Sequence, residues 1–126
     1  MCGNGARCIA RYGYENGLAG DKLNIETASG MVTGERIAQK LYRVRLNDPS
    51  FIKTGLSLNV GDRKYDYSYV ELGLPGLPHT VVPMQYFDFM DRDELRELGR
   101  RIRSDGRFPK GANVTFVKML DDNYLK

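Results

Sequence analysis

The sequence lacks tryptophan and is poor in the residues that bind metals, with one histidine and two cysteines among 126 residues. Two cysteines, Cys2 and Cys8, cannot build a disulfide framework. Together with the lone His79 they also fall short of the four closely spaced ligands of a structural zinc site. A chain of this length can bury a core without such cross-links. We therefore expect no metal and no disulfide scaffold.

Long apolar runs and a strong net charge are missing as well. No segment reaches the roughly 18 apolar residues of a membrane helix, and the N-terminus has no signal-peptide pattern. The net charge is only +3, from 19 basic and 16 acidic residues of interspersed sign. The basic cluster Arg100, Arg101 and Arg103 lies in an expected helix, where a solvated face is the simpler interpretation. These features predict a cytoplasmic protein with reduced thiols and with neither a nucleic-acid nor a membrane partner.

The spacing of apolar residues predicts two helices, over 5–16 and 91–103. Asp91 and Glu94 have the spacing of a capping box, which marks the start of the second helix. Strands are predicted over 23–28, 31–35, 37–46, 65–72, 79–82 and 113–119, the first two joined by a hairpin at Ser29-Gly30.

Two further patterns concern domain organisation and binding. Asn47-Asp48-Pro49-Ser50 is the best turn signal in the chain, and we expect a domain boundary after residue 48. Tyr65, Tyr67 and Tyr69 alternate along one predicted strand. Such a row could stack bases, but without a basic groove we expect it to be sheet surface or core.

The first residues carry the most chemical information. Cys2 precedes Gly3, Asn4 and Gly5 at the start of a predicted helix. Unpaired N–H groups at a helix N-terminus attract anions and favour the thiolate form of a nearby cysteine. Glycines let the backbone approach a ligand closely. These four residues alone are equally compatible with an inert buried cysteine beside a turn. Cys8 lies inside the helix near Ile9, and we expect it to pack in the core.

The octapeptide Met-Cys-Gly-Asn-Gly-Ala-Arg-Cys at residues 1–8 resembles the signature around the first catalytic cysteine of the diaminopimelate epimerase family. Five weaker matches follow in family order and extend the resemblance over essentially the whole chain: Ile25–Gly30, Val44–Leu46 with Pro49, Gly76–His79, Phe108–Pro109 and Asn113–Val114. Together they make the resemblance specific.

This resemblance implies an α/β (α+β) fold with two lobes, each a curved antiparallel sheet around a helix. We expect two partial lobes here: residues 1–48 as the later part of the N-terminal lobe and residues 49–126 as the first part of the C-terminal lobe. The implied activity is cofactor-independent interconversion of LL- and meso-diaminopimelate, an amino-acid substrate of lysine and peptidoglycan biosynthesis.

The resemblance also assigns roles to individual residues. Cys2 matches a catalytic acid/base, and His79 matches the histidine that supports the acid/base site. Gly3 and Asn4 match a substrate-binding pair, and Asn113 matches a further substrate-binding asparagine. Taken alone, a single histidine near a strand start is more often structural, so the role of His79 depends on the resemblance. Leu77 stands where the family has a substrate-contacting asparagine, which leaves the substrate specificity open.

Inverting a stereocentre requires a base on one face of the carbon and an acid on the other. Six residues of helix separate two side chains by about 9 Å of rise and about 240° of rotation, so Cys8 cannot be the partner of Cys2. The family's second cysteine has no counterpart in this sequence. We therefore expect the chain alone to be inactive, and the open sheet edges of partial lobes to favour a homo-oligomer.

Three alternatives remain. Two are enzymes expected to share the fold: a proline-racemase-like enzyme, which Asn4 disfavours, and a phenazine-biosynthesis type of isomerase, which generally lacks the cysteine. The third is a non-catalytic module that binds carboxylates or another protein.

Overall fold

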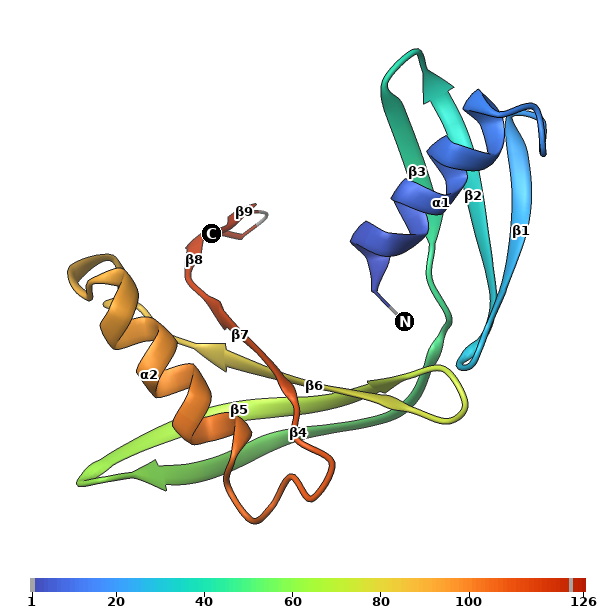
Figure 1. Ribbon diagram of the computed structural model, residues 1–126. Helices are drawn as coiled ribbons and strands as arrows, with labels where there is room; N and C mark the ends of the chain where they lie inside the picture. The colour runs from blue at the N-terminus through green and yellow to red at the C-terminus, as the bar shows by residue number, and fades with distance from the viewer. Residues whose placement is uncertain (1, 123) are drawn as a thin grey trace. The chain divides into compact units, whose positions relative to one another are not determined.

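The computed structural model describes residues 2–122 and 124–126, and its chain divides into two compact units (Figure 1). The first unit contains the residues up to Ser50 together with the loop Leu72–Leu77. The second contains Phe51–Glu71 and Pro78–Lys126. Two helices and antiparallel or mixed sheets are present, so the α+β class predicted from the sequence is confirmed.

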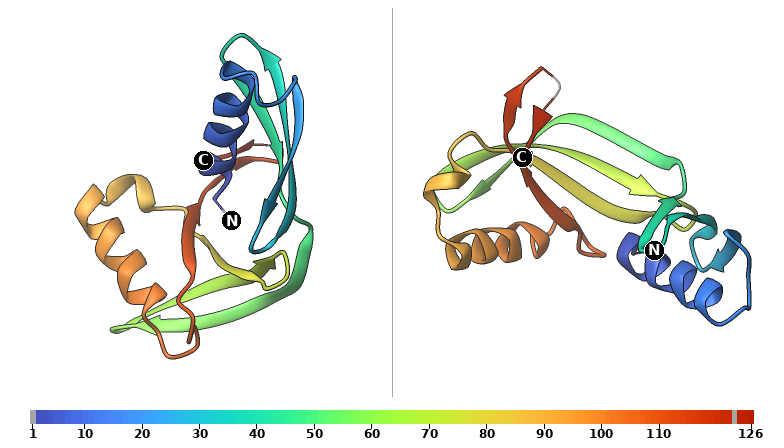
Figure 2. Two further views of the ribbon diagram at one scale, coloured as in Figure 1. Left: turned by 45° about the vertical axis from the view of Figure 1, so that its right-hand side comes forward. Right: turned by 90° about the horizontal axis from the view of Figure 1, so that it is seen from above.

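The first unit is one helix lying across a three-stranded antiparallel sheet (Figures 1 and 2). Its elements are α1 (Gly3–Glu15), β1 (Lys22–Thr27), β2 (Gly30–Ala38) and β3 (Leu41–Arg45), with the strands in the order β1-β2-β3. Ala6, Ile25 and Val32 form its buried cluster. The helix turns its smallest residues toward the sheet, because Ala6, Ala10 and Gly13 are the buried positions of α1.

Helix α1 approaches strand β2 very closely. A Cβ atom added at Gly34 would lie 2.8 Å from the Cβ of Ala10 and 3.2 Å from a methyl carbon of Leu23. Atoms at 2.8 Å overlap, so β2 can pass under α1 only because residue 34 has no side chain. This close contact sets which side of α1 is buried.

The sequence predicted the first hairpin correctly but missed the second. Strand β1 pairs with β2 in the register Thr27↔Gly30, so the turn residues are Ala28 and Ser29, one position earlier than the expected Ser29-Gly30. The single strand expected over 37–46 is wrong: the chain turns at Gln39-Lys40, and β2 pairs antiparallel with β3. Neither turn residue is a glycine, proline or asparagine, so the local signals for a turn are weak.

The second unit contains a four-stranded sheet in the order β4-β5-β6-β7, with α2 (Arg92–Arg103) packed against it. The strands are β4 (Pro49–Val60), β5 (Arg63–Leu72), β6 (Leu77–Pro83) and β7 (Asn113–Val117). A short helix η1 (Phe87–Phe89) and a small hairpin of β8 (Met119–Asp121) and β9 (Tyr124–Leu125) complete it. Strands β6 and β7 run parallel, which differs from the antiparallel sheet expected for this part of the chain.

The core of this unit lies between α2 and the sheet. Leu98 and Ile102 of α2 meet Leu58, Val82 and the aromatic residues of β5 there. Tyr65 and Tyr67 are buried in this cluster, and the Tyr67 ring contacts Phe108 edge-on at 5.7 Å between centroids. Tyr65 and Tyr67 are therefore core residues, and Tyr69 packs partly buried against the same cluster. The sequence favoured such a structural role over base stacking.

Two strand predictions need correction here. Strand β4 was missed because its first residues are exposed and include Pro49 and Ser50, which the sequence assigned to a turn. Its buried Leu58 and half-buried Leu56 and Val60 alternate only near its end. The last predicted strand, over 113–119, is interrupted at Lys118, where β7 ends and the small hairpin begins.

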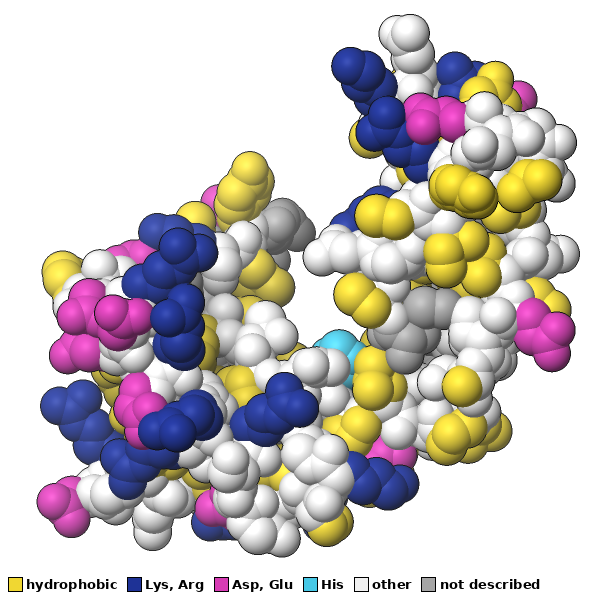
Figure 3. Space-filling model, viewed as in Figure 1, with side chains coloured by type: hydrophobic (Ala, Val, Ile, Leu, Met, Phe, Trp, Pro, Cys, Tyr) yellow, Lys and Arg dark blue, Asp and Glu magenta, His cyan; other side chains and the backbone are white. Residues whose placement is uncertain are grey.

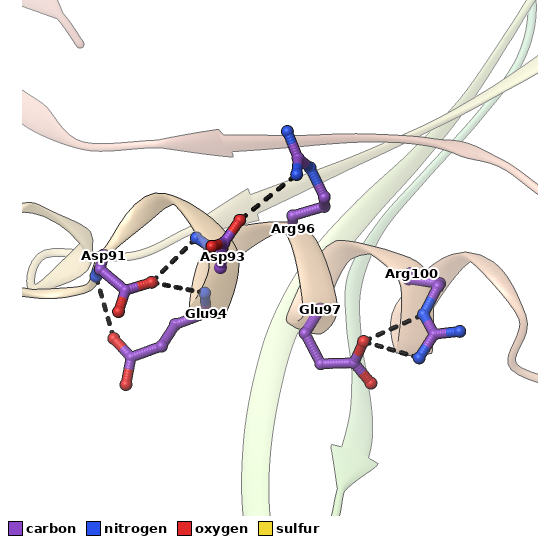
Figure 4. A network of polar contacts seen from close by, with 6 residues as sticks. All are labelled: Asp91, Asp93, Glu94, Arg96, Glu97 and Arg100. Carbon is purple, nitrogen blue, oxygen red and sulfur yellow. Dashed lines mark hydrogen bonds and ion pairs between the residues drawn. The ribbon is translucent and has the colours of Figure 1, made fainter.

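Helix α2 begins as its capping box predicts (Figure 4). The Asp91 carboxylate accepts hydrogen bonds from the backbone N–H groups of Asp93 and Glu94, both at 2.8 Å. In return, Glu94 accepts one from the Asp91 N–H at 2.9 Å. On the outer face Arg100 pairs with Glu97 at 2.8 Å. Figure 3 shows basic and acidic side chains mixed over this helix, in agreement with the solvated face expected for its arginines.

The loop 72–77 is held within the first unit by close backbone packing. Gly73 donates its N–H to the Asp48 carbonyl at 3.2 Å and has a φ of +79°. A Cβ atom at this position would lie 2.5 Å from the Ser29 carbonyl oxygen. Only glycine combines this conformation with this contact. Among the described residues, no helix is long and apolar enough to cross a membrane.

Candidate functional site

The backbone at the start of α1 is arranged as a helix N-terminus with a cysteine in the capping position. Cys2 is extended, with φ −106° and ψ 119°, and is exposed to solvent. Its carbonyl accepts the first helical hydrogen bond, from the Ala6 N–H at 3.0 Å. The N–H groups of the first turn therefore lie beside the Cys2 side chain without partners inside the helix.

This environment stabilises the thiolate form of Cys2. The backbone N–H groups of Gly5 and Asn4 lower the pKa of the Cys2 thiol because they donate to the charged sulfur, and the Arg7 cation lowers this pKa further. The Cys2 Cβ lies 3.9 Å from the position of a Cβ at Gly5, so the side chain folds over the first turn. The Cys2 side chain makes no capping hydrogen bond to the described residues of α1.

Asn4 lies in the same turn and is exposed. Its side-chain oxygen Oδ1 accepts a hydrogen bond from Nη2 of Arg7, one turn further along α1. Gly3 is half-buried, and a Cβ there would make only ordinary contacts, the closest to Leu46 at 3.7 Å. The structure thus brings together three of the residues that the sequence proposed: Cys2, Gly3 and Asn4.

Cys8 is not a core residue, and the expectation that it packs inside is wrong. It is exposed and lines an open groove of ≈ 450 Å³ with Arg7, Arg11 and Tyr42. The buried stripe of α1 follows its small residues, and Cys8 falls outside it. The neighbouring Ile9 is also 50% exposed, so the apolar character of these two residues misled the prediction.

His79 and Asn113 lie side by side in the second unit, as register partners on the parallel strands β6 and β7. Register partners on neighbouring strands point to the same face of a sheet. His79 is half-buried, and its Nε2 is buried without a hydrogen-bond partner among residues 2–122 and 124–126. Burial lowers the pKa of His79 because it disfavours the imidazolium. A neutral imidazole with an unused polar nitrogen therefore lies next to the exposed amide of Asn113.

Sequence reasoning missed one member of the site, Arg7. Its spacing of three residues from Asn4 was a usable signal, because side chains three apart meet on a helix surface.

The fold and the site at the start of α1 define a class of protein: an α+β chain with an activated thiol and donor N–H groups at the N-terminus of a helix. Such a site can hold an anionic group and present a thiolate to a neighbouring atom.

The chain matches no protein-family profile. It is similar over nearly all of its length to curated diaminopimelate epimerases. That of Aquifex aeolicus is 34% identical over 128 residues, which cover 100% of this chain and 43% of the relative. That of Caldanaerobacter subterraneus subsp. tengcongensis is 30% identical over 139 residues, which cover 99% of this chain and 50% of the relative. That of Alkaliphilus metalliredigens is 31% identical over 143 residues, which cover 100% of this chain and 48% of the relative.

These similarities confirm the resemblance found in the sequence: the chain is related to the diaminopimelate epimerases. It spans about half the length of the curated relatives that it matches.

Proposed function

We propose that this chain supplies one acid/base site of a cofactor-independent epimerase that interconverts LL- and meso-diaminopimelate. The main support is the exposed Cys2, whose thiolate form is favoured by the first turn of α1. The similarity to diaminopimelate epimerases over the whole chain supports the choice of substrate.

In the proposed reaction the Cys2 thiolate removes the α-proton of the substrate. The proton passes to sulfur, and the electron pair of the C–H bond remains on the α-carbon and its carboxylate. Backbone N–H groups of the first turn and the Asn4 amide donate hydrogen bonds to that carboxylate, which gains charge in this step. Gly3 gives the carboxylate room to approach the backbone.

Epimerisation also needs a proton donor on the opposite face of the α-carbon. Cys8 does not meet this requirement because it lies six residues further along the same helix. The proposal therefore requires a second thiol from outside these 126 residues, and the chain alone would be inactive in the full reaction. His79 and Asn113 are proposed to support the acid/base site and to bind substrate.

The proposal extends to organisation. Residues 1–48 would form the later part of an N-terminal epimerase lobe and residues 49–126 the first part of a C-terminal lobe. We further propose that the protein acts in the cytoplasm on a small amino-acid substrate and can form homo-oligomers.

The decisive experiment is exchange of the substrate α-proton for deuterium in D₂O, followed by NMR. Exchange needs only one base, because a thiol that equilibrates with solvent returns a deuteron to the carbon. We expect slow exchange with LL- or meso-diaminopimelate that Cys2→Ala abolishes and Cys8→Ala leaves unchanged.

Exchange that survives Cys2→Ala would contradict the assignment of the base. Exchange of proline instead of diaminopimelate would favour the racemase alternative. Absence of exchange in a folded chain would favour a non-catalytic carboxylate-binding module.

A further inference from the structure

Arg7 contacts the proposed carboxylate site through Asn4. Its Nη2 donates to the Oδ1 atom of Asn4, and its Nη1 lies 3.8 Å from the position of a Cβ at Gly3. A guanidinium has only donors, so the Asn4 atom that faces Arg7 must be the amide oxygen. The Nδ2 group of Asn4, with its two donor hydrogens, therefore points away from Arg7.

This contact differs from the other arginine contacts of the first unit. Arg11 pairs with the Glu15 carboxylate at 2.8 Å, and Arg36 with Asp21 at 3.3 Å. In the described part of the chain, Arg7 has the neutral Asn4 amide as its hydrogen-bond partner and no carboxylate. Arg7, which is not paired with an acid, therefore holds the neutral Asn4 side chain beside the first turn of α1.

An exposed asparagine without a partner would sample several rotamers, and binding a ligand would then cost the entropy of selecting one. A side chain already held in its binding rotamer avoids that cost. The contact thus prepares Asn4 before a ligand arrives.

We propose that Arg7 is a positioning residue for Asn4: by holding the amide oxygen, it directs the Nδ2 donor of Asn4 toward a carboxylate bound at the first turn of α1. This inference rests on the proposed function, since it concerns the same carboxylate site. It adds a residue that acts through Asn4 and does not itself contact the reacting atoms.

The test uses two alkylating reagents that differ in charge. Iodoacetate carries a carboxylate and iodoacetamide does not, while both transfer their carbon to the thiolate with loss of iodide. The ratio of their rates at Cys2, measured by peptide mass spectrometry, therefore reports carboxylate recognition. No turnover is needed, so failure of the epimerase proposal in the exchange experiment is a separate result.

We expect Arg7→Gln to lower the iodoacetate-to-iodoacetamide ratio at Cys2 about tenfold, the factor that one lost charge-assisted hydrogen bond produces. Asn4→Ala should lower it similarly, and Arg7→Gln should add no further loss in the Asn4→Ala chain, because Arg7 acts through Asn4. The matched control Arg11→Gln, on the same helix, should leave the ratio unchanged.

If Arg7→Gln lowered the reagent ratio at Cys2 equally in the unmodified chain and in the Asn4→Ala chain, the proposal would be overturned, because Arg7 would then attract the anion directly. An unchanged ratio in Arg7→Gln would overturn it as well. Circular dichroism identifies any variant that has failed to fold. Arg7→Lys then repeats the cycle with the charge retained and the planar fork removed.

Discussion

At the scale of single residues, the site depends on backbone atoms as much as on side chains. The Cys2 sulfur is activated mainly by two N–H groups of the chain that follows it. Such an arrangement needs no distant partner, and this explains why the sequence alone predicted it. A cysteine before a Gly-Asn-Gly turn and a helix implies both the donors and the room for a ligand.

The lowered pKa of Cys2 leads to a prediction for its reactivity. In a Cys8→Ala chain the alkylation rate of the remaining thiol should rise with pH around a midpoint below that of the same thiol in the urea-unfolded chain. The direction follows because the neighbouring N–H groups stabilise the thiolate, which then persists to lower pH. The measurement is the iodoacetamide rate from pH 5 to pH 10. A midpoint at or above that of the unfolded chain would contradict this description of the site.

Cys8 shows where residue-level reasoning fails. Cys8 behaves as a small apolar residue and is followed by Ile9, and the sequence therefore placed it inside. Which side of α1 is buried is decided by the contact between Ala10 and Gly34, residues from different elements. No local pattern contains that information.

At the scale of elements, local signals succeeded wherever the chain supplies its own hydrogen-bond partners. The capping box at Asp91 and the hairpin of β1 and β2 are examples, because each is closed within a few residues. The turn at Gln39-Lys40 and strand β4 were missed because pairing with neighbouring strands fixes them. Register shifts between Arg36 and Ala38 further weaken the period-two pattern there.

The close approach of α1 and β2 leads to a prediction for stability. Gly34→Ala should destabilise the protein by about 1–3 kcal/mol, because the added methyl group overlaps Ala10 and Leu23. Gly20→Ala is the matched control, since nothing lies within 4 Å of its added methyl group. Urea unfolding followed by circular dichroism measures both.

A second substitution tests whether the overlap is the cause. Adding Ala10→Gly to the Gly34→Ala chain should recover part of the loss, although glycine in a helix itself costs about 1 kcal/mol. Equal stability of Gly34→Ala and Gly20→Ala would show that α1 and β2 are further apart than described.

At the scale of the whole molecule, the sheets of both units end in strands with unpaired edges within the described residues. Strand β4 lies at one end of its sheet and exposes Phe51 and Ile52, which are 49% and 60% accessible. Exposed edges of this kind pair with other chains. The order of strands and the parallel pairing of β6 with β7 could not be predicted from local patterns, because they join residues more than thirty positions apart.

We therefore predict that the isolated chain associates. Multi-angle light scattering should show an average mass above that of one chain, increasing with concentration. Ile52→Lys should reduce the association, because a charge on an edge strand opposes pairing. Gln39→Lys, at an exposed position in the turn between β2 and β3, controls for the added charge alone. A monodisperse monomer at every concentration would contradict the prediction.

The contact between Gly73 and Ser29 has a consequence for the order of folding. The first unit is discontinuous in sequence: its last segment, residues 72–77, follows residues 51–71, which belong to the second unit. On the ribosome, the residues up to Ser50 therefore emerge long before the segment that completes their packing. Synthesis of the intervening residues sets a minimum delay, and during it the turns at Ser29 and Asp48 remain open to solvent and to chaperones.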